Sequence, residues 1–382
     1  MARRWMFGIA TGFVALLGMN VASSDVSAQA VRPPSNAVTN AAPGGSGPNA
    51  PSAPGTEKGS NVDVELWGKV RKGVEGKVSI PDTKSGVLVQ SGGEAWRNFR
   101  NGPLPTWGGW ALTGIVGLLA AFFAIRGRIK IEHGMSGRTL VRFNDLERMS
   151  HWLMAMSFIV LAVSGLNVLY GRYVLLPIIG KGAFAALSIF LKWLHNHVAF
   201  AFMIGLALSF VLWLKHNFPT KEDLVWLAQG GGMFSKHSHP PARKFNAGQK
   251  ILFWMIMLGG LSISMSGWSL MFPFESHMFA KTFGLLNVFG LSLPTSATAI
   301  QEMQFATAWH GIVGLFLICV IIGHIYIGTV GMEGAFDAMG SGEVDENWAK
   351  EHHSIWAQEE IEQRDGLRDA RGARNGRVQP AE

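Results

Sequence analysis

The sequence of residues 306–330, ATAWHGIVGLFLICVIIGHIYIGTV, is apolar over the length of a membrane span, yet it contains two histidines. His310 and His324 are fourteen residues apart, close to four helical turns, so both imidazoles leave one helix face, roughly 21 Å apart along the axis. An ionisable side chain inside a span is costly and therefore marks a functional site by default. One histidine near each end of the span predicts two stacked cofactors, each of which needs a second ligand from elsewhere in the chain.

Other apolar runs close to the ~20 residues that a bilayer requires predict four more spans, at 105–125, 149–169, 193–214 and 251–272. A mean hydropathy of +0.21, 14 Trp and 24 Phe agree with an all-α integral membrane protein that carries some soluble chain. The single cysteine, Cys319, excludes an internal disulfide and a Cys-ligated cluster, and no CxxCH motif is present for covalent haem attachment.

Composition divides the rest of the chain. Residues 1–30 have the pattern of a secretory signal peptide, with an uncleaved anchor as the alternative, and residues 31–60 are Pro-, Gly- and Ser-rich and predict a disordered linker. Residues 61–103 show some β-like alternation and are expected to form a small periplasmic segment without assignable chemistry. The predicted remainder is an extra transmembrane helix at 104–126, a four-span domain at 142–335 and a C-terminal tail at 336–382.

Loop charge predicts the orientation. Lys and Arg gather in the loops after the first and third spans and in the tail, whereas the other two loops hold only Arg172, Lys181, Lys192 and Lys281. The positive-inside rule therefore places the N-terminal region in the periplasm and the tail in the cytoplasm of a bacterial inner membrane. The basic residues behind the net charge of +7 lie mostly on the predicted cytoplasmic side of the membrane. This distribution accounts for the charge, and no nucleic-acid partner is expected.

This topology turns sequence positions into depths. His151 opens the second span near the inner face and His195 opens the third near the outer face, which predicts an outer pair with His310 and an inner pair with His324. Two bis-histidine haems require that arrangement. The alternative is interfacial or hydrogen-bonded core histidines, and His197 is a rival to His195. Solvated side chains are expected for the loop and tail histidines, which are His133, His216, His237, His239, His277, His352 and His353.

Residues 142–362 resemble the cytochrome b (gamma) subunit of membrane-bound formate dehydrogenases. The resemblance rests on RMSHW, LALSF–HNFPTKEDLVWL, KFNAGQKILFWMIM, the span ending GHIYIGT, and NWAKEHHSIW. It implies a four-helix diheme cytochrome b bundle, to which the helix at 104–126 is an addition. Partner subunits are implied too: a molybdenum- or tungsten-containing catalytic (alpha) subunit and an iron–sulfur (beta) subunit.

The resemblance also implies site residues. The axial ligands of two b haems fall on His151, His195, His310 and His324, and a quinone pocket falls on Asn246, Gly248 and Gln249. At the start of the fourth span, amide side chains suit a quinone carbonyl, although Asn246 has the alternative role of a helix cap. Arg148, one turn before His151, is a candidate haem-propionate partner or a snorkelling arginine.

The expected function is electron transfer from the periplasmic iron–sulfur subunit through two b haems to menaquinone or ubiquinone at the cytoplasmic side. The chain has no catalytic residue of its own in this interpretation and no formate activity alone. The alternatives are the cytochrome b subunit of a nickel–iron hydrogenase or of a thiosulfate or polysulfide reductase, against which NAGQK argues, and a haem-free membrane anchor.

Overall fold

The computed structural model describes residues 93–235 and 237–375, with side-chain positions as far as residue 366. In this part of the chain, five helices are long and apolar enough to cross a membrane, as the sequence predicts. The signal peptide expected at 1–30, the linker at 31–60 and the β-like alternation before residue 93 lie outside the described residues.

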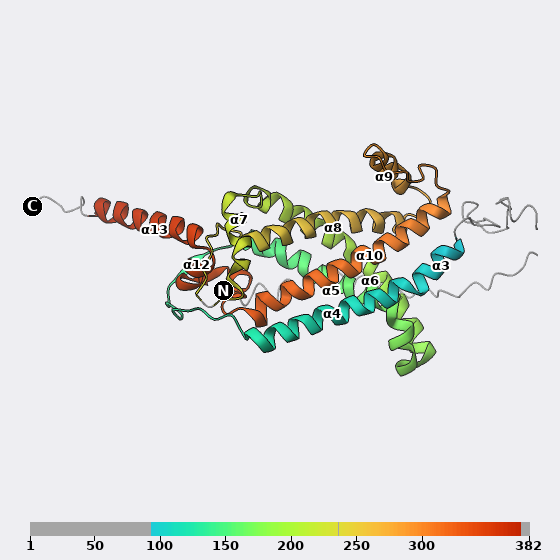
Figure 1. The fold of residues 1–382 in the computed structure, drawn as a ribbon, viewed down its shortest axis with the longest axis horizontal. Helices are drawn as coiled ribbons and strands as arrows, with labels where there is room; N and C mark the ends of the chain where they lie inside the picture. The colour runs from blue at the N-terminus through green and yellow to red at the C-terminus, as the bar shows by residue number, and fades with distance from the viewer. Residues whose placement is uncertain (1–92, 236, 376–382) are drawn as a thin grey trace, which may run out of the picture. The chain divides into compact units, whose positions relative to one another are not determined.

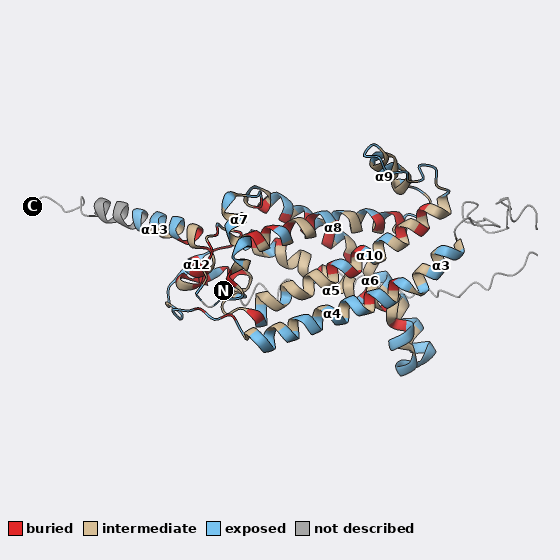
Figure 2. Cartoon of the chain, viewed as in Figure 1, coloured by how far each residue is buried: buried red, intermediate tan, exposed pale blue. Residues whose placement is uncertain are grey.

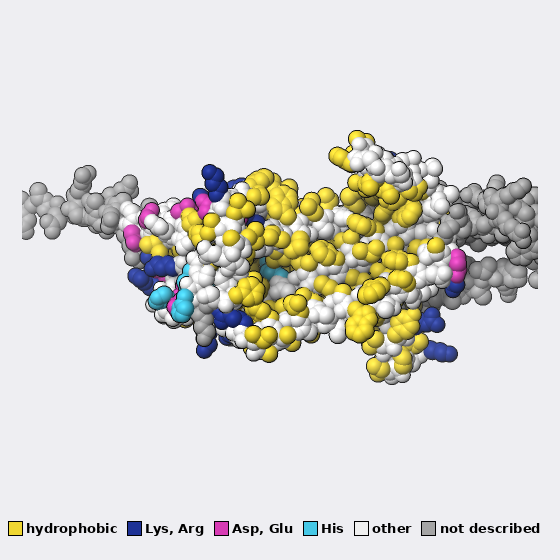
Figure 3. All heavy atoms as spheres, viewed as in Figure 1, with side chains coloured by type: hydrophobic (Ala, Val, Ile, Leu, Met, Phe, Trp, Pro, Cys, Tyr) yellow, Lys and Arg dark blue, Asp and Glu magenta, His cyan; other side chains and the backbone are white. Residues whose placement is uncertain are grey.

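The five long helices form the bundle, and their bounds are Pro103–Arg126 (α4), Asp145–Val174 (α5), Leu176–Trp213 (α6), Ala247–Met271 (α8) and Ala299–Tyr326 (α10). Helix α5 packs along α6, and α10 lies against both α8 and the additional helix α4 (Figure 1). Their outward faces are apolar, and Figure 3 shows hydrophobic side chains along the helices while charged ones gather at the α12 end. This pattern is that of a multi-pass membrane protein.

Hydrogen-bonded caps set where the long helices begin. Asn144 accepts from the backbone N–H of Glu147, whose carboxylate accepts in return from the N–H of Asn144, and this capping box starts α5. Asn246 and Gln249 form the same reciprocal box at the start of α8, and Thr298 opens α10 in the same way. The caps fix the helical register of the histidines that follow.

Helix α6 begins well before the span predicted at 193–214. Leu175 alone separates it from α5, and Gly180 interrupts its first turns with a φ of 76°, a left-handed conformation that glycine adopts without a steric penalty. The stretch from Lys181 to Lys192 is rich in Ala and Leu, which are good helix formers. The loop expected between the second and third spans is therefore largely helical, because hydropathy marks the lipid-crossing part of a helix and not its end.

Shorter elements connect and flank the spans. The α-helices are Gly93–Asn101 (α3), Lys221–Ala228 (α7), Met278–Asn287 (α9), Asp337–Gly340 (α11), Glu346–His352 (α12) and Ser354–Asn375 (α13). There are also two short 3₁₀ helices, Leu214–His216 (η1) and Gly230–Gly232 (η2), and a π-helical segment, Ile327–Gly331 (η3). The strands are Thr139–Val141 (β1) and Glu343–Asp345 (β2). Helix α3 occupies the end of the expected periplasmic segment.

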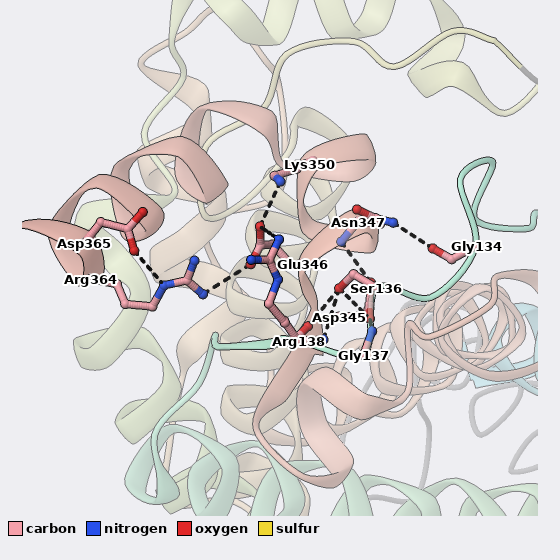
Figure 4. A network of polar contacts seen from close by, with 10 residues as sticks. All are labelled: Gly134, Ser136, Gly137, Arg138, Asp345, Glu346, Asn347, Lys350, Arg364 and Asp365. Atoms are coloured by element: carbon pink, nitrogen blue, oxygen red, sulfur yellow. Dashed lines mark hydrogen bonds and ion pairs between the residues drawn. The ribbon is translucent and has the colours of Figure 1, made fainter. Parts of the chain in front are cut away.

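Residues 337–366, here called the C-terminal clasp, fold back onto the start of α5. Strand β2 pairs antiparallel with β1, Leu140 opposite Val344, and the carbonyl of Gly342 accepts from the N–H of Arg142 and of Phe143. The carboxylate of Glu346 is 2% exposed and accepts hydrogen bonds from three basic side chains (Figure 4), which are Arg138, Lys350 and Arg364. Charge-assisted bonds of this kind hold the clasp against the bundle.

The clasp also has an apolar core of its own. Val344, Ala349 and Ala357 are fully buried, and Trp348 and Trp356 are nearly so, in the cluster that includes Trp213 of α6. Figure 2 shows this burial at α12 and the exposed face along α13. The clasp is thus an integral part of the bundle's end.

Candidate haem and quinone site

Helices α6 and α10 bring the two histidines of the predicted outer pair face to face. The ring centroids of His195 and His310 are 6.1 Å apart. The rival, His197, points elsewhere: its Nδ1 lies 2.7 Å from the carbonyl of Trp193 and its ring packs against that indole. The structure therefore brings His195, and not His197, to His310.

Two serines orient the outer pair. Nδ1 of His195 lies 2.7 Å from Oγ of Ser164, and Nδ1 of His310 lies 3.0 Å from Oγ of Ser266. Each serine hydroxyl donates to a backbone carbonyl of its own helix, at Val160 for Ser164 and at Ile263 for Ser266, so each oxygen accepts from the imidazole N–H. Because Nδ1 carries the proton, Nε2 is left as the unprotonated, metal-binding nitrogen.

Helices α5 and α10 form the second pair. His151, in the second turn of α5, has its ring centroid 6.2 Å from that of His324, in the last turn of α10. Nδ1 of His151 is buried and has no hydrogen-bond partner among the described residues. A buried polar atom left in this state is uncommon and indicates a group that the protein atoms alone do not supply.

Both separations fit a metal ion held between two imidazoles. A metal–imidazole bond is about 2.0 Å long and the nitrogen lies about 1.1 Å from the ring centroid, so two trans imidazoles have centroids roughly 6.2 Å apart. The observed values, 6.1 Å and 6.2 Å, agree with this distance at both pairs. The four histidines therefore fit two bis-histidine haems, one for each pair.

A large cavity reaches the His151–His324 pair. Its volume is about 1390 Å³, which exceeds the roughly 300–1,000 Å³ of a typical site for one small ligand. Asn246, Gly248 and Gln249 line the same cavity. The structure thus brings the three predicted quinone residues to one cavity with the His151–His324 pair.

The three residues of the NAGQ turn have distinct surroundings. The side-chain carbonyls of Asn246 and Gln249 are occupied by the capping box, as the alternative interpretation of Asn246 expects, but their amide NH₂ groups donate to no other group in the described chain. An ideal Cβ on Gly248 would lie 2.8 Å from the ring of Trp226, so glycine is needed for close packing there. Capping leaves both amide donors available to a ligand.

Arg148 is committed to protein groups. Its guanidinium donates to Asp145 at 3.0 Å and to the carbonyls of Met339 and Gly340, which anchors α11 to α5. It is not among the residues that line the large cavity. The haem-propionate role of Arg148 remains a prediction, and these contacts give the arginine a structural role that needs no haem.

The loop and tail histidines divide into two groups. His133 and His237 are exposed and contact Glu351 and Glu132, in agreement with the solvated expectation. For His353 the solvated expectation is wrong, because this side chain is 1% exposed and donates from Nδ1 to the carbonyl of Arg243. Burial holds the pKa of His353 well below its usual value. His352 lines the cavity, and burial lowers its pKa to about 4.

Comparison with known proteins identifies the family of the chain. The model of the family described as Prokaryotic cytochrome b561 matches residues 142–342, just over half of the chain. The chain belongs to this family. Membership implies haem b, in agreement with the histidine pairs, and the match spans α5, α6, α8 and α10 but not α4.

Individual relatives of this cytochrome b561 family member carry a common description. The chain is 29% identical over 222 residues to the cytochrome b556(fdo) subunit of formate dehydrogenase from Escherichia coli K12, a match that covers 58% of this chain and 93% of that protein. It is 26% identical over 225 residues to the nitrate-inducible cytochrome b556(Fdn) subunit of the same strain, with 58% and 92% covered. The cytochrome b556 subunit of Haemophilus influenzae formate dehydrogenase is 24% identical over 235 residues, with 61% and 87% covered.

Sequence reasoning missed four residues at the site. Ser164 and Ser266 contact the predicted ligands His195 and His310 from neighbouring helices. Arg142, which follows β1, and His352 of the clasp line the cavity. No local signal marks any of the four. The two serines and Arg142 contact residues distant in sequence, and only the packing of the helices reveals these contacts.

Proposed function

We propose that the chain is the cytochrome b subunit of a membrane-bound formate dehydrogenase, passing electrons from a periplasmic iron–sulfur subunit across the membrane to a quinone at the cytoplasmic side. The observation that carries the proposal is the cavity that joins the His151–His324 pair to Asn246, Gly248 and Gln249. A redox pair at one end of the bundle thereby lies beside a pocket with amide donors. The names of the formate dehydrogenase relatives support the choice of complex.

His195 and His310 hold one b haem and His151 and His324 the other. When bound, haem b supplies one-electron redox chemistry at a potential that its axial ligands and their hydrogen bonds help to set. Ser164 and Ser266 fix the imidazoles of the outer pair in the ligating tautomer. The apolar walls of the bundle keep water away from both pairs.

Asn246 and Gln249 donate from their amide groups to a quinone carbonyl, and Gly248 lets Trp226 close one side of the pocket. Formate oxidation by the catalytic subunit releases carbon dioxide, one proton and two electrons. The quinone takes up these two electrons and two protons from the cytoplasm. If formate is oxidised in the periplasm, the cycle charges the membrane without a pump.

Loop charge supports the orientation within this proposal. Arg128, Lys130, Lys221 and Lys244 all lie at the clasp end of the bundle, which the positive-inside rule assigns to the cytoplasm. The signal peptide at 1–30 and the periplasmic segment that ends at 103 complete the proposed topology. Helix α4, packed on α10, carries the chain inward before the four-helix domain begins.

Haem content per chain is the first test. A dithionite-reduced minus oxidised spectrum should show two b haems in the wild type, one in His324→Ala and two in the control His197→Ala. Retention of one haem in His324→Ala also shows that the variant is folded. A folded wild type without haem would refute the electron-transfer function and leave a membrane anchor as the better account.

The identity of the complex needs a second test. Purification through a tag on this chain should recover an iron–sulfur subunit and a molybdenum- or tungsten-containing subunit, and formate should reduce the haems of the purified assembly. Reduction of the haems by hydrogen in place of formate would instead identify a nickel–iron hydrogenase. Oxidation of the reduced haems by thiosulfate or polysulfide would identify a thiosulfate or polysulfide reductase.

A further inference from the structure

Arg142 is a buried arginine without a carboxylate partner among the described residues. It is 3% exposed, and its Nη2 donates to the carbonyl of Lys244 at 2.9 Å and to Oε1 of Gln249 at 3.3 Å. Nε and Nη1 are buried and have no hydrogen-bond partner in the same part of the chain. A buried cation with two unused donors is costly to keep, so a partner beyond these protein groups is expected.

The clasp holds this guanidinium in place. Its central carbon lies 4.9 Å from the ring centroid of Trp348 and 5.6 Å from that of Trp356, with Phe143 on another side at 5.4 Å. Aromatic faces attract a cation and exclude water from it. Burial lowers the pKa of Arg142 to about 9, so the side chain stays charged at neutral pH. The result is a fixed, desolvated positive charge.

The residues that carry these unpartnered nitrogens line one cavity. Arg142 lines the same large cavity as Gln249, Trp348 and His352. The indole Nε1 of Trp348 and Nε2 of His352 are, like the two arginine nitrogens, buried and unpartnered within the described chain. Such a wall fits a ligand that presents acceptor oxygens.

The carboxylates in this wall are already engaged. Glu351 accepts from the backbone N–H of Glu132 and of His133 and contacts the ring of His133. Glu132 contacts the rings of His237 and His239. Neither is hydrogen-bonded to Arg142, so neither carboxylate of this wall supplies an acceptor for Nε and Nη1.

We propose that Arg142 is a quinone-binding residue, which donates from Nε and Nη1 to a carbonyl oxygen of the ring. This inference rests on the proposed quinone reduction. As electrons arrive from formate through the partner subunits, negative charge develops on that oxygen before it takes a proton from the cytoplasm. Arg142 stabilises this charge without gaining or losing a proton itself. Its bond to Gln249 favours the quinone over the other available acceptor, a haem propionate.

The experiment compares Arg142→Gln and Arg142→Lys with the wild type in membranes that contain the whole complex. Arg138→Gln is the matched control, because Arg138 comes from the same segment and contacts the clasp through Glu346 but does not line the cavity. Haem reduced by a stoichiometric amount of dithionite is mixed with increasing decylubiquinone or menadione, and its reoxidation rate is followed. Haem per chain and haem midpoint potentials are measured alongside.

Loss of charge-assisted bonds from Arg142→Gln should weaken quinone binding about tenfold to a hundredfold, seen as a higher half-saturating quinone concentration. Arg142→Lys should recover part of the loss, since it keeps the charge without the planar fork. Haem content and potentials should stay at wild-type values in both, and Arg138→Gln should match the wild type throughout.

Reoxidation of Arg142→Gln within twofold of the wild type, with both haems present, would overturn the proposal. So would a shifted haem potential with unchanged quinone dependence, which would assign Arg142 to a haem propionate. Failure of the wild type itself to bind haem or to be reoxidised by quinone would instead refute the proposed function, so the two failures are distinguishable.

Discussion

Gly205 allows α5 and α6 to approach each other more closely than any larger residue would. An ideal Cβ at this position would lie 2.7 Å from the backbone nitrogen of Met154 and 2.9 Å from its Cα, where ordinary contact begins at 3.4 Å. Gly205→Ala therefore requires the helices to separate locally by about 0.7 Å, the difference between 3.4 and 2.7 Å. Small residues permit such approaches in membrane helices.

The same displacement acts on a buried hydrogen bond. The hydroxyls of Ser150 and Ser209 are 2.7 Å apart, and a shift of 0.7 Å would stretch this bond to about 3.4 Å, beyond the normal range. Overpacking costs about 1–3 kcal/mol and the lost bond about 1 kcal/mol, so Gly205→Ala should lower the free energy of unfolding by about 2–4 kcal/mol. His151 lies one turn from Met154, so the haem that we propose for His151 and His324 should be the first to be lost.

The assay is equilibrium unfolding in detergent micelles with added sodium dodecyl sulfate, followed by circular dichroism, with haem counted per chain. Gly117→Ala on α4 is the control, because nothing lies within 4 Å of the Cβ position there. An unfolding free energy for Gly205→Ala equal to that of the control, with two haems retained, would refute the close contact between α5 and α6.

Three further predictions concern the ligands and the clasp. Ser164→Ala should weaken haem binding at the His195–His310 pair about tenfold to a hundredfold. Ser157→Ala is the control and should leave haem binding unchanged, because the Ser157 hydroxyl bonds only carbonyls of its own helix. Equal haem affinity in the two variants would contradict the orienting role of Ser164. Acid should loosen the clasp: burial keeps the pKa of His352 and of His353 below 6.5 in the folded state, so the released segment binds protons first as the pH falls. At pH 5.5 the loss is about 1.4 kcal/mol for His352, whose pKa of about 4 in the folded state compares with about 6.5 in the released segment, and His353 adds to the loss in the same direction. Amide hydrogen exchange of residues 343–366, divided by the intrinsic exchange rate at each pH, should therefore show less protection at pH 5.5 than at pH 7.5. Equal protection at the two pH values would exclude this linkage. Glu346→Gln removes the negative charge that three basic side chains contact, and it should destabilise the clasp by about 2 kcal/mol. This destabilisation should be seen as faster proteolysis of the C-terminal tail. An unchanged cleavage rate would show that these ion pairs contribute little to the stability of the clasp.

The site was partly predictable from local pattern. The fourteen-residue spacing of His310 and His324, together with loop charge, predicts which histidines share a depth, and the structure brings those pairs together. The NAGQ turn was predicted at the start of the fourth span, where Asn246 and Gln249 form a capping box. Both patterns work because helix periodicity and capping involve residues only a few positions apart.

The clasp was not predictable in this way. Its sequence is rich in charge and amide groups, with Trp348 and Trp356 widely spaced, so composition alone describes a solvated tail. Burial of Glu346 and His353 depends on partners about a hundred or more residues away, at Arg138 and Arg243. No short-range pattern encodes such a contact.

The sequence by itself predicted a multi-pass membrane protein, the five spans found in the described part of the chain, and the two pairs into which four histidines fall, because hydropathy and helical period are local properties. The tertiary structure alone decided that His195 rather than His197 meets His310, that Ser164 and Ser266 contact these two histidines, and that Arg142 is buried beside Gln249. These outcomes depend on how separate helices pack, and the packing of side chains from distant segments is a property of the whole fold.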